Sequence, residues 1–163
     1  MADSPKAGSI GSDKNVIRVA HLLPTMEIGG RERIVADLCQ TAHRAGVEPI
    51  LMTYDLPKPT YRLIDTPSVC RIRLDRRNSD FRHQLQRALI DERIDVLHAQ
   101  GHVSLALAAG ATGGVPILGT LHMALGTGWR WLLPIVRGLR SADRLTAVSE
   151  DLARRCFRTS GKS

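Results

Sequence analysis

The 163-residue sequence contains few aromatic residues, 4% in all, and this scarcity argues against the base-stacking surfaces of proteins that bind single-stranded nucleic acid. It also contains neither a zinc-finger nor an RNP-type pattern. The three cysteines, Cys39, Cys70 and Cys156, are odd in number and widely spaced, so they predict neither a disulfide framework nor a zinc site. We therefore expect no nucleic-acid partner and no bound metal.

Long apolar runs are also missing. The most hydrophobic weakly charged stretch, residues 103–125, is interrupted by glycines and a proline, which makes it a poor membrane span. The first 15 residues are polar and have no apolar centre of a secretory signal, so we predict a cytoplasmic protein. Length and composition predict a flexible tail at 1–14 and a single domain at 15–163.

Positive charge is what the sequence has in excess. Lysine and arginine number 23 against 16 aspartates and glutamates, which leaves a formal net charge of +7. Such an excess attracts anions: nucleic acid, phosphorylated metabolites or an acidic lipid surface. One group of cations, Arg71, Arg73, Arg76 and Arg77, we interpret as a solvated edge of the domain.

Short apolar segments alternate with amphipathic ones along the chain. This alternation predicts a doubly wound, mostly parallel Rossmann-like α/β sheet with helices on both faces. The irregular segment 55–67 is expected to be a loop, and Gly46 is expected to end the first helix. Strands are expected at 16–23, 47–53, 69–74, 95–99, 117–121 and 144–148, and helices at about 31–45, 80–93, 102–112, 129–140 (interrupted at Pro134) and 150–158.

Ligands of such sheets bind outside the carboxyl ends of the strands. The first strand is followed by Gly29 and Gly30 at the start of a helix, where free N–H groups suit a phosphate. An equally weighted alternative is a tight loop that requires positive φ. A nicotinamide-cofactor fingerprint is disfavoured because only this adjacent pair of glycines is present. Ser149 is expected to cap a later helix at the same edge of the sheet, where the strands have their carboxyl ends, which is called the rim below.

Two histidines, His98 and His122, lie at the ends of neighbouring predicted strands. Neutral imidazole can donate or accept hydrogen bonds to sugar hydroxyls and phosphate oxygens, so this pair favours a functional role. His21 lies inside a predicted strand and is expected to be structural, and Asp95 is expected at the opposite edge of the sheet.

Four segments together resemble the family-4 glycosyltransferases of the GT-B fold. The second of these segments has Gln100 where the family often has a second histidine, and Met123 follows the third where the family often has glycine. The segments are MEIGGRER at 26–33, DVLHAQ at 95–100, VPILGTLH at 115–122 and ADRLTAVSE at 142–150, within a resemblance that spans about 16–157.

The resemblance implies transfer of a sugar from a nucleotide-sugar to an acceptor hydroxyl, with retention at the anomeric carbon and no cofactor besides the donor as co-substrate. It covers the first of two Rossmann-like domains, the one that receives the acceptor. By analogy, Gly29 and Gly30 would face the donor diphosphate or the acceptor, His122 would act beside the transferred sugar, and His98 and Gln100 would line the acceptor side. The donor would be held by a second domain or by a partner chain, so this chain alone is expected to show little or no turnover.

Other interpretations stay open. One is a non-catalytic Rossmann-like module that binds a phosphorylated ligand or a donor-binding partner subunit, and a weaker one is a different nucleotide-binding α/β protein. Residues 129–133, followed by Arg137 and Arg140, combine aromatic, aliphatic and basic side chains. They could lie on the inner face of an acidic membrane, which would suit a lipid-linked rather than a soluble sugar acceptor, but a core-packed helix with a solvated arginine face is favoured.

Overall fold

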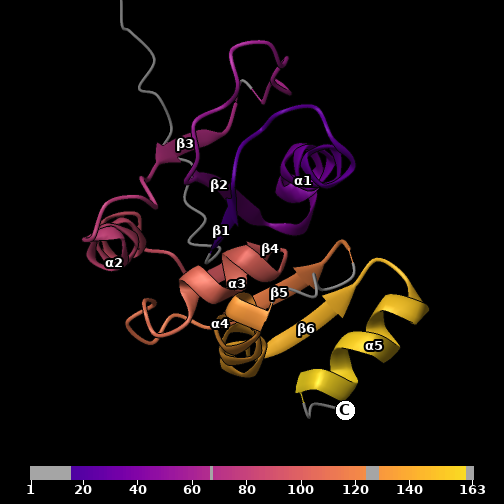
Figure 1. Cartoon of the computed structure of the whole chain (residues 1–163). Helices are drawn as coiled ribbons and strands as arrows, with labels where there is room; N and C mark the ends of the chain where they lie inside the picture. Colours follow the sequence, from indigo (N-terminus) through magenta and orange to yellow (C-terminus); the bar gives the residue numbers. More distant parts are fainter. Residues whose placement is uncertain (1–15, 67, 124–128, 161–163) are drawn as a thin grey trace, which may run out of the picture.

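The chain folds around one six-stranded sheet (Figure 1). The computed structural model describes residues 16–66, 68–123 and 129–160, so the predicted tail at 1–14 lies outside the described residues. The strand order is β3-β2-β1-β4-β5-β6 and every neighbouring pair is parallel. The strands are β1 (Ile17–Leu23), β2 (Val47–Thr53), β3 (Cys70–Arg73), β4 (Val96–Gln100), β5 (Ile117–Leu121) and β6 (Arg144–Ala147).

Helices cover both faces of this sheet, which confirms the predicted doubly wound architecture. On one face, α1 packs Val35, Ala36 and Cys39 against Leu23 and Leu51. On the other face, α2, α3 and α4 enclose the larger core (Figure 1). The helices are α1 (Gly30–Thr41), the short 3₁₀ helix η1 (Ala42–Ala45), α2 (Phe81–Asp91), α3 (His102–Ala108), α4 (Trp129–Ser141) and α5 (Glu150–Ser160).

The strand order creates a switch point between β1 and β4. From β1 the chain moves to β2 and β3 on one side, and then it returns to β4 and continues outward to β5 and β6. The connections that leave β1 and β4 therefore run to opposite faces of the sheet, and the carboxyl ends at such a switch point are where ligands of these sheets bind. The register places His21 of β1 beside His98 of β4, and Gln100 of β4 beside Thr120 of β5.

Two local predictions need correction. The helix predicted to break at Pro134 is continuous, because α4 runs through this residue to Ser141. The helix predicted to reach residue 112 ends at Ala108, and the chain then turns at Gly110, whose φ is 72°. The predicted end of the first helical segment is confirmed, since Gly46 follows η1 in the left-handed conformation, with φ at 69°.

None of the described helices is both long enough and apolar enough to cross a lipid bilayer. Within the described parts of the chain, no group of three or more histidine, cysteine, aspartate or glutamate side chains is placed to hold a metal ion.

Candidate functional site

Three histidines gather between β1, β4 and β5: His21 and His98 lie within β1 and β4, and His122 follows the last residue of β5. The predicted position of His98 at a strand end is therefore wrong, because β4 continues to Gln100. The rings of His21 and His98 lie with centroids 5.1 Å apart, and both side chains are buried. His122, in the loop directly after β5, joins them through Gln100. The site therefore unites His98 and His122 as the sequence predicts, and it adds His21, which the sequence interpretation treats as structural.

Gln100 connects two of these imidazoles. Its amide oxygen accepts a hydrogen bond from Nε2 of His122 at 2.7 Å, and its amide nitrogen lies 3.5 Å from Nδ1 of His21. Only 1% of Gln100 is exposed, and its backbone carbonyl also accepts the Ser104 hydroxyl at 2.9 Å. Because Nε2 of His122 donates to an amide oxygen, the proton of the neutral ring lies on Nε2 and the Nδ1 atom is left as an acceptor. The predicted contact of Gln100 with a substrate stays a prediction.

A second chain of hydrogen bonds orients His98. Thr120 Oγ1 lies 2.7 Å from Nε2 of His98 and 2.7 Å from Oγ1 of Thr146, whose hydroxyl also lies 3.3 Å from the carbonyl oxygen of Gly119. The hydroxyls of β5 and β6 thus orient the His98 ring. Its predicted contact with an acceptor stays a prediction.

The histidines of the site are held in the neutral form. Burial lowers the pKa of His21 to about 4. Burial, together with the neighbouring His21 and His122, lowers the pKa of His98 to about 3. The pKa of His122 is also lowered, first by burial and then by the charge of Arg31, although Glu32 acts in the opposite direction. Near neutral pH these rings therefore serve as hydrogen-bonding groups and not as cations.

The glycines at the start of α1 do not adopt the conformation that the loop alternative requires. Gly29 is extended, with φ at −163°, and Gly30 is not among the glycines with positive φ. No described side chain caps α1 through a hydrogen bond. A Cβ added to Gly30 would meet no described atom within 4 Å, but one added to Gly29 would lie 2.5 Å from a Glu32 carboxylate oxygen, so a negative charge already lies at the start of this helix. The backbone angles argue against the tight loop, and binding of an anion by the glycine pair stays a prediction.

Arg31 and Glu32 form an ion pair within this rim. Glu32 is buried, with 7% of its surface exposed, and its carboxylate accepts Nε of Arg31 at 2.8 Å. The Arg31 guanidinium reaches the start of α3, where a Cβ added to Gly101 would lie 3.7 Å from Arg31 Nη1. The sequence interpretation included both residues only as part of a motif. The signal that could have singled them out is a charged pair in the first turn of a helix that no side chain caps.

Ser149 is confirmed as a helix cap. Its hydroxyl accepts the N–H of Leu152 at 3.3 Å at the start of α5, and the N–H of its neighbour Val148 bonds the carbonyl of Leu121. Ser149 therefore follows β6 beside the end of β5, and contact of its hydroxyl with a substrate stays a prediction.

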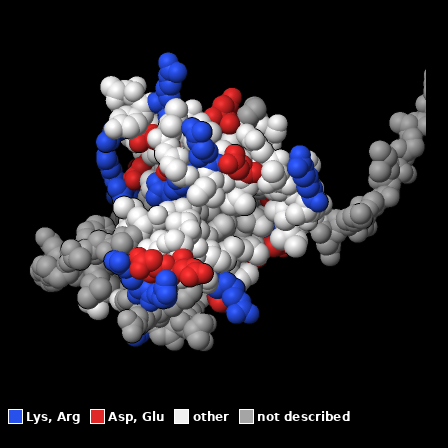
Figure 2. Space-filling model, turned by 90° about the vertical axis from the view of Figure 1, so that its right-hand side faces the viewer, with Lys and Arg blue, Asp and Glu red and all other residues white. Residues whose placement is uncertain are grey.

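Figure 2 looks onto the face that carries α1 and α5, where acidic and basic side chains are mixed.

Asp95 lies at the opposite edge of the sheet, as predicted. Its carboxylate accepts the N–H of Arg18 at 2.8 Å, and its own N–H bonds the Arg18 carbonyl at 2.9 Å. In the same way, the Asp143 carboxylate accepts the N–H of Ile117 at 2.7 Å, and the N–H of Asp143 bonds the Ile117 carbonyl at 2.8 Å. These two aspartates align the starts of neighbouring strands and have no place in the site.

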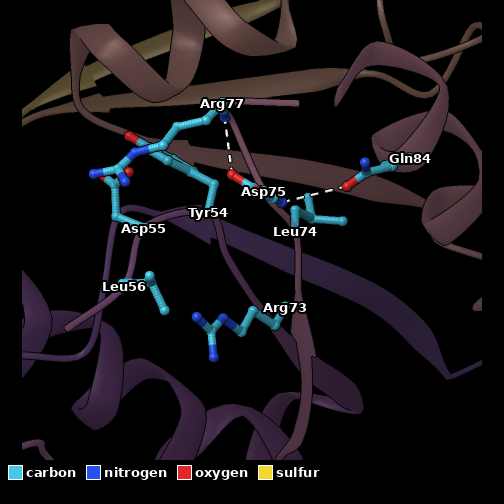
Figure 3. Close-up of a pocket in the computed structure, with 8 residues that line it drawn as sticks. All are labelled: Tyr54, Asp55, Leu56, Arg73, Leu74, Asp75, Arg77 and Gln84. Atoms are coloured by element: carbon cyan, nitrogen blue, oxygen red, sulfur yellow. Dashed lines mark hydrogen bonds between the residues drawn. The ribbon is translucent and has the colours of Figure 1, made fainter. Parts of the chain in front are cut away.

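Two adjoining pockets open beside the rim. One, of about 420 Å³, lies between the start of α1 and the loop after β2. The other, of about 320 Å³, lies between the ends of β2 and β3, and Figure 3 shows its walls. The interpretation of Arg73, Arg76 and Arg77 as a solvated edge is therefore incomplete, because Arg73 and Arg77 line the second pocket and Arg76 and Arg77 line the first.

The sequence model described as Glycosyltransferase Family 4 matches residues 28–161. No curated protein sequence matches the chain at a significant level.

Solved structures match most of this chain with less than half of their own length. A sucrose-phosphate synthase from Thermosynechococcus elongatus superimposes with a TM-score of 0.64 and 14% identity, over 87% of this chain and 44% of its own. A glycosyltransferase from Rickettsia africae superimposes with a TM-score of 0.63 and 14% identity, over 91% of this chain and 41% of its own. MurG from Acinetobacter baumannii superimposes with a TM-score of 0.61 and 13% identity, over 83% of this chain and 42% of its own. At these identities the likeness shows the fold, which is that of one half of a GT-B glycosyltransferase.

Proposed function

The chain belongs to glycosyltransferase family 4, and from that premise we propose that it is the acceptor-binding half of an enzyme that transfers a sugar from a nucleotide-sugar to an acceptor hydroxyl with retention. By family and fold it is glycosyltransferase-like and corresponds to an N-terminal half. The donor would be held by a second domain or a partner chain that faces the rim. The neighbours' lengths support this division, since the chain covers 41–44% of them.

The observation that carries the proposal is the arrangement of His122 beside the uncapped start of α1. Because Gln100 holds Nε2 of His122, the Nδ1 atom is free to accept a hydrogen bond from a sugar hydroxyl. The α1 N-terminus would supply positive potential for the diphosphate that leaves the donor, while the charge of Arg31 is already paired with Glu32. We assign His122 as the residue beside the transferred sugar, and Gly30 as the position where the absence of a side chain permits close approach.

The acceptor would be a sugar or a lipid-linked molecule. A lipid-linked acceptor would bring the chain to the inner face of the cytoplasmic membrane. Of the segment considered for membrane contact, the side chains of 129–132 lie outside the described residues, and 81% of the next side chain, Leu133, is exposed. Flotation with anionic and neutral liposomes tests this contact, and absence from both lipid fractions would exclude it.

The rim itself can be tested by NMR on the isotopically labelled chain. Titration with nucleotide-sugars and candidate acceptors should shift the amide signals of Gly29 and Gly30 and the ring signals of His122, while the amide of Asp95 at the opposite edge should not move. Gly30→Ala should keep the fold, because a Cβ there has open space, and should weaken binding several-fold. Gln40→Ala on the exposed side of α1 is the matched control. Shifts confined to the Asp95 edge, or full binding by Gly30→Ala, would contradict the proposal.

A further inference from the structure

The two pockets beside the rim adjoin each other and share part of their walls, and together they are called the recess. Asp55, Leu56 and Arg77 line both. The recess lies at the carboxyl ends of β2 and β3, and its larger part also borders Arg31 at the start of α1. Parallel strands end at the same edge of the sheet, so the recess and the histidine rim open on the same edge. A molecule seated in the recess can therefore extend toward His122.

Five cationic and four acidic side chains line the two pockets, and only some of them pair with each other. Asp55 forms an ion pair with the Arg76 guanidinium at 2.6 Å and Glu32 forms one with Arg31, whereas Asp75 and Glu27 accept only the backbone N–H groups of Arg77 and Lys58, at 2.9 and 2.5 Å, and keep their charge. Arg73 and Arg77 form no ion pair with any described carboxylate.

The unpaired arginines come from different segments. In Figure 3 Arg73, at the end of β3, and Arg77, in the loop that follows, reach the pocket from different sides, with Leu56 between them. The Lys58 ammonium, 5.2 Å from the centre of the Tyr61 ring, borders the larger part of the recess. Arg76 is held in place by Asp55 and by the ring of Tyr54, whose centre lies 5.8 Å from its guanidinium carbon.

We infer that this recess binds a phosphate monoester carried by the acceptor. Guanidinium groups bind phosphate oxygens through paired N–H donors, and two unpaired arginines around one opening provide such donors from two directions. Leu56, Leu74 and Tyr54 offer an apolar wall for the carbon skeleton next to the phosphate. The inference rests on the proposed function for the role of acceptor, but the binding site itself is defined by residues outside the histidine rim.

The test measures binding without any donor, so its failure is distinct from a failure of the transfer proposal. Calorimetric or NMR titration of the chain with glucose 6-phosphate, inorganic phosphate and glucose should show saturable binding of the two phosphates and much weaker binding of glucose. Arg73→Ala and Arg77→Ala should each weaken glucose 6-phosphate binding by about ten-fold, the loss expected for one charge-assisted contact. Arg44→Ala removes the same charge from an exposed position in η1 and should leave the affinity unchanged.

A second experiment distinguishes a soluble phosphate monoester from one carried by a lipid. Phosphatidylcholine vesicles are sedimented with the chain in the presence and absence of phosphatidic acid, whose headgroup is a phosphate monoester. Binding to either glucose 6-phosphate or phosphatidic acid that depends on Arg73 and Arg77 supports the site, and the probe that binds identifies a soluble or a lipid-borne acceptor. Failure of both probes to bind, or equal losses in Arg44→Ala and the two recess variants, overturns it.

Discussion

Gln100 shows how one residue can set the chemistry of another. Replacing it by leucine leaves Nε2–H of His122 without its acceptor and Nδ1 of His21 without its donor. We expect Gln100→Leu to lower the free energy of unfolding by about 1–3 kcal/mol, the cost of unpaired buried polar groups. We also expect the Nε2–H signal of His122 in imidazole nitrogen NMR to weaken as the ring takes up its other tautomer.

Gln40→Leu on the exposed face of α1 is the control for the Gln100 variant, because it makes the same substitution away from the histidines. It should leave both the unfolding free energy and the His122 signal unchanged. An unaltered His122 tautomer in Gln100→Leu would show that Gln100 does not position this ring.

Two buried histidines predict how stability depends on pH. In the folded chain burial lowers the pKa of His21 to about 4, and burial with the neighbouring histidines lowers that of His98 to about 3, from an ordinary value of 6.5. Between the lowered pKa values and 6.5, the unfolded chain binds protons that the folded chain does not. The free energy of unfolding therefore has its full value above pH 6.5 and falls as the pH drops toward 4. Each histidine contributes a slope of up to about 1.4 kcal/mol per pH unit.

Urea unfolding measured across this pH range checks the slope. His98→Gln keeps a hydrogen-bonding group near Thr120 but removes one titrating ring, so its stability should fall less steeply with decreasing pH than that of the wild type. Equal slopes in the two proteins would contradict the assignment of His98 as a neutral buried group.

At the scale of elements, α3 and α4 approach each other closely at Gly138. A Cβ added there would lie 2.7 Å from the backbone N of Ala106 and 2.8 Å from the backbone carbon of Leu105. Backbone atoms cannot move aside as a side-chain end can, so the two helices would have to separate. We expect Gly138→Ala to lower the unfolding free energy by about 1–3 kcal/mol, the usual cost of overpacking.

Chemical denaturation tests this helix contact, with Gly30→Ala as the matched glycine substitution that meets open space. Alanine also has the higher helix propensity, so the Gly30 variant should be as stable as the wild type or slightly more stable. Equal stability of Gly138→Ala and the wild type would show that the contact between α3 and α4 can relax.

Elements also separate structural from functional residues within the four family segments. Asp95, the first residue of one segment, and Asp143, the second residue of another, bond the starts of neighbouring strands, whereas His98 lies within β4 and His122 follows the carboxyl end of β5. A motif that begins at the start of a strand and finishes at its end thus carries a structural residue and a site residue at opposite edges of the sheet.

At the scale of the whole molecule, the chain corresponds to less than half of the structures it resembles. Transfer requires the donor and acceptor to be positioned together and the leaving diphosphate to be stabilised, and under the proposed function this chain would supply only one wall of such a site. We expect no transfer above background when the isolated chain is incubated with nucleotide-sugars and phosphorylated acceptors, with the products followed by mass spectrometry. Robust turnover by the chain alone would overturn this expectation, and the anomeric configuration of any product would then test retention by NMR.

Much of the fold could be predicted from the chain because local patterns encode it. The predicted segments 47–53 and 117–121 agree with β2 and β5 at both ends, because apolar runs between turn residues mark buried strands. The break predicted at Pro134 was wrong because α4 is stabilised by its packing, with Ile135 and Leu139 buried in the core, which outweighs the missing N–H. Local propensity could not reveal this tertiary compensation.

The sequence by itself determined the succession of strands and helices along the chain, the family, and the presence of His122 and the glycine pair after strands, since periodicity and spacing are properties of the chain. Only the tertiary structure decided that Gln100 joins His122 to His21, that Arg31 reaches the start of α3, and that Arg73 and Arg77 enter one recess. These contacts connect residues far apart in the chain. They depend on strand register and side-chain direction, which no local pattern specifies.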